Sequence, residues 1–104
     1  MKLIHQSPYF TSYQCDRQRS FFIDFKHKSV KMSLCQLLAF RQQINSIDLD
    51  SHFDGRNKHG FELVMLCNNA HLFIFNTYEV IALKDFIKVT FAMLELNSMA
   101  ALNS

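Results

Sequence analysis

Two stretches of the chain, separated by about 52 residues, follow the same order of sequence patterns. Residues 9–15 and 61–67 both read as a strand that ends at a cysteine, and residues 33–47 and 85–99 both read as a helix. A repeat of this length indicates one supersecondary unit used twice. The sequence therefore predicts two similar halves, and this constrains the fold more than any other feature of the chain.

The first unit carries three predicted strands and a helix. Apolar and polar side chains alternate along residues 9–15 and 21–25, as in half-buried strands, and residues 29–32 form a short third strand. Ser33 and Gln36 have the spacing of a capping box and precede an apolar run, which predicts a helix start.

The second unit repeats this order. Its three predicted strands occupy residues 61–67, 71–75 and 79–83. Asn68 and Asn69 are expected to form the turn of the first hairpin, because asparagine tolerates the left-handed backbone that a short turn needs. Asp85 suits the start of the following helix, where its carboxylate meets free amide groups.

These patterns predict a single domain over residues 1–104. Unit one covers about 8–47, a polar linker containing Gly55 covers 48–59, and unit two covers about 60–98. The predicted fold class is α+β: a two-layer sandwich in which the tandem βββα repeat forms one antiparallel sheet with two helices on one face.

Composition indicates a folded protein of the cytoplasm. Apolar residues make up 49% of the chain and charged residues 19%, which is a globular composition. No apolar run approaches the roughly 18 residues of a membrane span, and the first residues are too polar for a signal peptide. Three scattered cysteines suit a reducing compartment, so we expect free thiols and a cytoplasmic location.

Positive charge is concentrated in the first unit, although the net charge of the chain is only +2. Aromatic residues such as Tyr9, Phe10 and Phe22 lie among these basic residues, a combination that can bind single-stranded nucleic acid or another polyanion. The candidate polyanion contacts are Arg17, Arg19, Lys26, Lys28 and Lys31.

The second unit is too apolar for an exposed sheet face. Residues placed on the outer face of its strands are aliphatic, and the last helix is apolar over well over half its circumference. We expect a second copy of the chain to cover this surface and form a homodimer. The alternative is cover by Leu3 and Ile4 or by the 48–59 loop. The candidate interface residues are Val64, Leu66, Leu72, Ile74 and Phe91.

No motif for catalysis or metal binding is recognisable. Asp50, His52 and Asp54 resemble the first positions of a calcium loop, but Phe61 occupies the position where a bidentate glutamate is required. The cysteines lack zinc-ligand spacing, and Cys35, in the first turn of a helix, is expected to be a packed thiol. We therefore predict no enzyme, no metal and no cofactor.

The pattern resembles a family of small uncharacterised bacterial proteins built from strand-turn-strand units with a capped helix. The segments that carry the resemblance are His5-Gln6, Cys15, residues 21–25, 30–34 and 72–75. Members of that family can carry a Cys-x-x-Cys before the second strand, whereas Gln18 follows Cys15 here, so no metal site is implied. The resemblance implies the fold and no activity.

The expected function is that of a small cytoplasmic interaction module that self-associates through its second unit. The alternative is a binder of single-stranded nucleic acid or another polyanion through the basic first unit. Salt separates the two, because phosphate binding weakens steeply with salt and an apolar interface does not.

Overall fold

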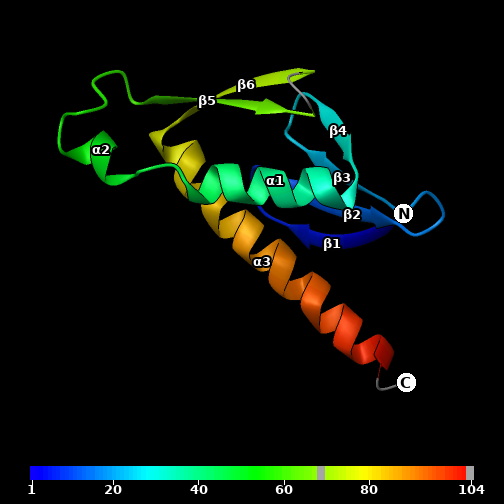
Figure 1. Cartoon of the computed structure of the whole chain (residues 1–104). Helices are drawn as coiled ribbons and strands as arrows, with labels where there is room; N and C mark the ends of the chain where they lie inside the picture. The colour runs from blue at the N-terminus through cyan, green and yellow to red at the C-terminus, as the bar shows by residue number, and fades with distance from the viewer. Residues whose placement is uncertain (68–69, 103–104) are drawn as a thin grey trace.

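The computed structural model describes residues 1–67 and 70–102, with side chains through Ser98, and has an α+β architecture (Figure 1). The predicted turn residues Asn68 and Asn69 lie outside the described part of the chain. A four-stranded antiparallel sheet has the order β1-β2-β3-β4, with strands Lys2–Gln6, Thr11–Cys15, Ser20–Asp24 and Ser29–Met32. A separate two-stranded hairpin consists of β5 (Phe61–Leu66) and β6 (His71–Asn76). The helices are α1 (Leu34–Asn45), α2 (Asp50–Phe53) and α3 (Thr77–Leu102).

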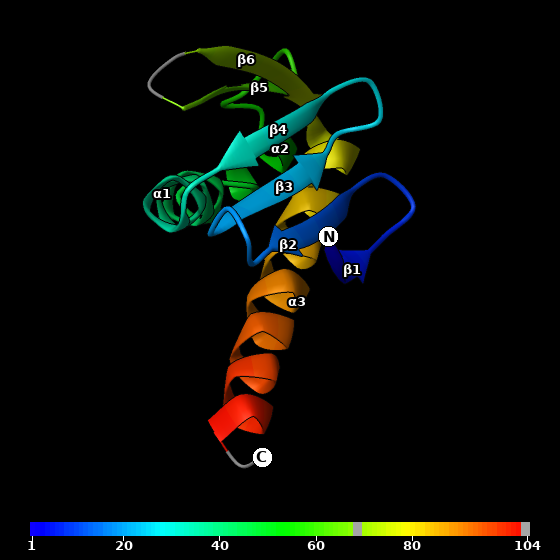
Figure 2. The same ribbon diagram turned by 90° about the vertical axis from the view of Figure 1, so that its right-hand side faces the viewer.

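The four-stranded sheet is a meander whose inner face packs against α1 and α3 (Figure 2). Ser12 of β2 lies opposite Ile23 of β3, which lies opposite Val30 of β4, and all three are buried. Ser12 is a polar residue on this inner face. It is accommodated inside because its hydroxyl lies 3.0 Å from that of Thr90 on α3.

The predicted start of α1 is confirmed. Ser33 accepts a hydrogen bond from the backbone N–H of Gln36 at 3.1 Å, and the Gln36 side chain accepts one from the N–H of Ser33 at 2.9 Å. This reciprocal pair satisfies two amide groups that the first turn of a helix leaves unpaired. Leu37, Phe40 and Ile44 then face the core.

The second unit lacks its predicted third strand, so the structure is not a clear tandem βββα repeat. Residues 79–83 form the first turns of α3 rather than a strand, and Asp85 lies within that helix. The cause is a second capping box: Asn76 accepts from the N–H of Glu79 at 2.8 Å, and Glu79 accepts from the N–H of Asn76 at 3.0 Å. The first unit, in contrast, has one strand more than predicted, because residues 2–6 form strand β1.

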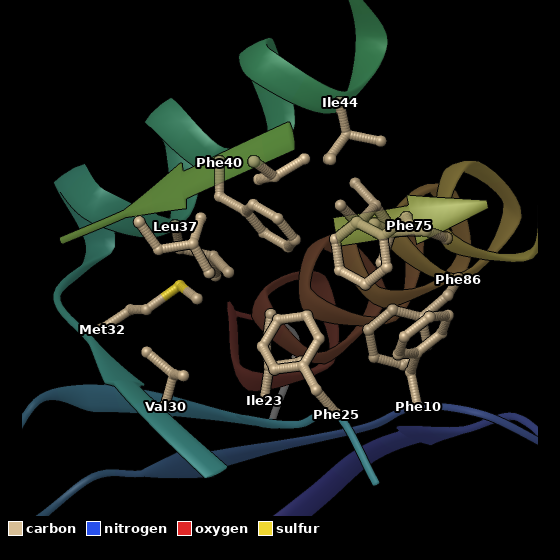
Figure 3. Packing of buried hydrophobic residues seen from close by; sticks show 14 of the residues in the cluster. Phe10, Ile23, Phe25, Val30, Met32, Leu37, Phe40, Ile44, Phe75 and Phe86 are labelled. Atoms are coloured by element: carbon tan, nitrogen blue, oxygen red, sulfur yellow. The ribbon is translucent and has the colours of Figure 1, made fainter. Parts of the chain in front are cut away.

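The core lies between the sheet, the two long helices and the inner face of the hairpin (Figure 3). It is rich in phenylalanine. Phe10 lies 5.5 Å from Phe86 and 6.2 Å from Phe75 between ring centroids, and Phe25 lies 5.9 Å from Phe40. These contacts join the hairpin to the rest of the molecule through side chains, since its strands pair only with each other.

In the described part of the chain, no helix is long and apolar enough to cross a membrane.

Candidate association surface

The outer side of the hairpin β5–β6 carries a cluster of exposed apolar side chains. Its cross-strand pairs are Leu63 with Ile74 and Met65 with Leu72, and Phe61 extends the cluster along β5. Their exposed fractions lie between 48% and 64%. We call this surface the outer hairpin face, formed by Phe61, Leu63, Met65, Leu72 and Ile74.

Two of the predicted interface residues lie on the opposite side. Val64 and Leu66 are buried, and Val64 lies opposite Phe73, which packs against the core. Their predicted exposure is therefore wrong. Apart from Glu62, β5 is apolar at every position, and Glu62 lies on the same side as Val64 and Leu66, where it meets His52. The strand sequence therefore does not show which alternate residues face inward, and a shift by one residue exchanges the two faces.

The other predicted interface residues are at the surface, in two separate places. Leu72 and Ile74 lie on the outer hairpin face. Phe91 is half-buried on α3, where the Arg41 guanidinium carbon lies 4.3 Å from its ring centroid. That cation–π contact belongs to a groove between α1 and α3 and not to the hairpin.

No described segment of the chain covers the outer hairpin face. Leu3 and Ile4 belong to β1, which pairs with β2 in the other sheet. The 48–59 segment is held at the base of β5, where His52 Nε2 lies 2.9 Å from Glu62 Oε1, and it leaves the outer face exposed. The alternative that the chain's own residues cover this face is therefore not observed among the described residues.

The five basic candidates do not form one patch. Arg17 and Arg19 lie in the turn between β2 and β3, and Lys26 and Lys28 lie at the other end of β3. A strand of this length spans roughly 17 Å, which separates the two groups. Lys26 Nζ is 4.4 Å from the Tyr9 ring centroid, and Lys28 Nζ is 5.9 Å from that of Phe73.

Lys31 instead belongs to a cross-strand row. Tyr13 of β2 lies opposite Phe22 of β3, which lies opposite Lys31 of β4. The two rings are half-buried and Lys31 is exposed, on the side of the sheet opposite Ile23 and Val30. This row places two aromatic side chains and one basic side chain on neighbouring strands of the same sheet face.

His52 forms a polar cluster that the sequence did not reveal. Its side chain is 0% exposed, with Nδ1 2.8 Å from Thr77 Oγ1 and Nε2 2.9 Å from Glu62 Oε1. The order hydroxyl, imidazole and carboxylate resembles a catalytic triad. A catalytic triad, however, must be open to a substrate, whereas the imidazole of His52 is fully covered. The cluster ties α2 and the start of α3 to β5.

One carboxylate of the calcium-like segment, that of Asp54, pairs with arginine. Arg56 lies 3.1 Å from Asp48 and 2.7 Å from Asp54 through its guanidinium nitrogens. Among residues 1–67 and 70–98, no three His, Cys, Asp or Glu side chains lie together as metal ligands would.

The cysteines carry no visible site. All three are unbridged, and Cys35 is exposed rather than packed, which corrects the expected buried thiol. Cys67 is half-buried, and its thiol lies 3.6 Å from the Lys31 carbonyl oxygen, as a weak donor.

A groove lies between α1 and α3. It has a volume of about 1010 Å³ and is lined by both apolar and charged side chains. Arg41, Lys84 and Lys88 stand along it together with Asp85 and Glu95, so its charge is mixed. Nothing in the groove selects one kind of ligand.

Comparison of the chain with protein-family models, with curated proteins and with solved structures gives no match.

Proposed function

We propose that the protein is a small interaction module that self-associates through the outer hairpin face. The observation that carries this proposal is the set of five large apolar side chains, about half exposed, on a hairpin that no described segment covers. Charged side chains are absent from this face among the described residues; Glu62, the charged residue of β5, points to His52.

The size of the surface fits association. Five such side chains expose roughly 500 Å² of apolar surface, which is at the upper end of the largest patch on a typical soluble monomer. Two copies packed face to face would remove roughly 1000 Å² from water, near the lower limit for a specific protein interface. Each Å² of apolar surface removed from water contributes about 25 cal/mol of favourable free energy, which opposes the entropy lost on association.

A charged substitution on this face tests the proposal. Leu63→Asp is expected to lower the mass of the assembly, because the interface would bury an unpaired carboxylate. Leu96→Asp is the matched control: Leu96 is 57% exposed on α3, against 64% for Leu63 on the hairpin. Multi-angle light scattering at micromolar concentration gives the masses. A wild-type protein of 12.2 kDa would contradict the proposal.

Binding of a polyanion to the first unit is the second candidate. It is favoured by the row Tyr13, Phe22 and Lys31, since bases stack on aromatic side chains while lysine meets phosphate. Fluorescence anisotropy with labelled single-stranded oligothymidine at low salt tests it. Phe22→Ala should weaken binding more than Phe53→Ala, which removes an exposed ring far along the chain. Equal affinities would contradict a site on this row.

A further inference from the structure

Within residues 1–67 and 70–102, four strands lie at sheet edges, namely β1, β4, β5 and β6. An edge strand presents unpaired backbone N–H and C=O groups that can pair with another strand. Proteins protect such edges with charged side chains, bulges or cover by other elements. The four edges here differ in their protection.

The edge of β5 is closed by a side chain from α1. In the amide orientation that satisfies both groups, Gln43 donates to the Met65 carbonyl oxygen at 3.0 Å and accepts from the Met65 N–H at 3.3 Å. A primary amide in this position takes the place of the peptide group of a neighbouring strand. No further strand can pair with β5 at Met65.

The Gln43 contact also shows which backbone groups of β6 point outward. Because the Met65 groups face α1, Met65 and Leu72 form a pair without hydrogen bonds between them. Antiparallel pairs alternate, so the N–H and C=O of Leu72 and of Ile74 point away from β5. In the described part of the chain, no hydrogen-bond partner occurs for these groups.

The edges of β1 and β4 carry protection that β6 lacks. Strand β1 has Lys2 and a register shift between Leu3 and His5. On β4, Lys31 is exposed and its carbonyl oxygen meets the Cys67 thiol. Strand β6, with the sequence HLFIFN, has no lysine, no proline and no bulge. In Figures 1 and 2, it is the strand of the hairpin farther from α1.

We infer that β6 pairs antiparallel with β6 of a second copy, around a two-fold axis at Phe73. Leu72 of one copy then lies opposite Ile74 of the other, and their outward backbone groups form the new hydrogen bonds. The pairing joins two hairpins into one four-stranded sheet. This inference rests on the proposed self-association and specifies its geometry.

The paired sheet requires a further contact. Joining two hairpins edge to edge places two outer hairpin faces side by side, with roughly 1000 Å² of exposed apolar surface, more than soluble proteins tolerate in one patch. The same face of a second pair covers it as one sheet packs on another at about 10 Å. Edge pairing and face packing together give a tetramer with D2 symmetry.

Substitution of Leu72 by proline distinguishes association through the β6 edge from association through the outer hairpin face. Proline removes the outward N–H while leaving the hydrogen bonds between β5 and β6 intact, a position that edge strands accept. Leu72→Ala is the control, because it shortens the side chain and keeps the N–H. Circular dichroism and thermal unfolding check that both variants fold, and light scattering measures their masses.

We expect the wild type at four times the chain mass of 12.2 kDa and Leu72→Pro at half the wild-type mass. Leu72→Ala also truncates a side chain of the outer hairpin face, so the loss of the N–H is measured by how far the mass of Leu72→Pro falls below that of Leu72→Ala. The double variant Leu63→Asp with Leu72→Pro should be a monomer. Equal masses for Leu72→Pro and Leu72→Ala, in an assembly of more than one chain, would overturn the edge pairing and leave the association through the face standing. A wild-type monomer would overturn both.

Hydrogen exchange supplies a second readout that needs no variant. If β6 pairs with a second copy, the amide protons of Leu72 and Ile74 exchange as slowly as that of Phe73, which the hairpin ladder already protects. Fast exchange at Leu72 and Ile74 beside slow exchange at Phe73 would show a free edge and overturn the inference.

Discussion

His52 shows how one buried polar residue can hold a polar segment in place. The 48–59 segment has few apolar side chains; Leu49 packs against the core, and the imidazole of His52 is fully covered. The ring lies within hydrogen-bond distance of Thr77 on α3 and Glu62 on β5. Asn57 adds to the cluster by accepting from the Gly60 N–H at 3.0 Å. Gly60 has φ +67°, a conformation that side-chain-bearing residues rarely adopt.

Replacement of His52 should therefore be costly. His52→Ala opens a cavity and removes one partner each from the Thr77 hydroxyl and the Glu62 carboxylate, which keep only the longer contacts to the Gly60 carbonyl at 3.4 Å and to Asn57 at 3.3 Å. We expect a loss of about 2–4 kcal/mol in the free energy of unfolding, measured by urea denaturation. His59→Ala is the control, because His59 is exposed in the same segment and should change stability by less than about 0.5 kcal/mol. Equal changes in the free energy of unfolding for the two substitutions would show that the His52 cluster does not stabilise the fold.

The buried pair Ser12 and Thr90 joins the sheet to α3 in the same way. Both hydroxyls are inaccessible and lie 3.0 Å apart. We expect Ser12→Ala or Thr90→Val alone to cost about 1–3 kcal/mol, because each leaves one buried hydroxyl without its partner. The double variant should cost less than the sum of the two, as a double-mutant cycle in urea measures. Strict additivity would mean that the two hydroxyls do not interact.

At the scale of the element, the start of α3 decides how the second half folds. Asn76 closes β6 and caps α3 at once, so the chain passes from strand to helix without a loop. Asn76→Ala removes the cap and should cost about 1 kcal/mol. Far-UV circular dichroism during urea unfolding measures this, with Asn45→Ala, at the last residue of α1, as the control. A loss no larger than that of the control would show that the cap does not hold the helix start.

Sequence patterns predicted the first half better than the second, for a physical reason. In residues 9–47, polar and apolar side chains alternate clearly, so three strands and the capped helix were placed correctly. In residues 61–83, almost every position is apolar, and the period that separates a strand from a helix is lost. The capping pair Asn76 and Glu79 was the available signal for the start of α3. It lies where the predicted repeat requires a turn followed by a third strand.

The candidate surface was predicted only in part, for the same reason. Leu72 and Ile74 were placed on the exposed side of the hairpin, whereas Val64 and Leu66 were exchanged with Leu63 and Met65. The excess of apolar residues in the second unit was visible in the sequence, but its distribution between two faces depended on register. The unpaired backbone groups of β6 could not be predicted from the sequence, since the contact of Gln43 with Met65 is what shows which groups point outward.

On the scale of the whole molecule, the hairpin packs on the larger sheet through side chains and exposes five large apolar side chains on its outer face. It meets the rest of the protein through phenylalanine packing and the β5 edge, with no strand pairing to the larger sheet. One face of it therefore stabilises the monomer while the other is available for association. Assembly should then add to the stability of the fold itself, because any contact made only by the folded chain shifts unfolding by mass action.

This coupling predicts that thermal stability depends on protein concentration. A hundredfold increase in concentration should raise the melting temperature of the wild type by about 5 °C, since association contributes on the order of 1 kcal/mol per chain over that range. Differential scanning fluorimetry at several concentrations measures the shift. Leu63→Asp should reduce the dependence, and Leu96→Asp should retain it. Because the interface is apolar, the dependence should persist in 1 M sodium chloride, where paired surface charges are screened within roughly 3 Å. A melting temperature that is independent of concentration, or a dependence abolished by salt, would contradict apolar self-association through the hairpin.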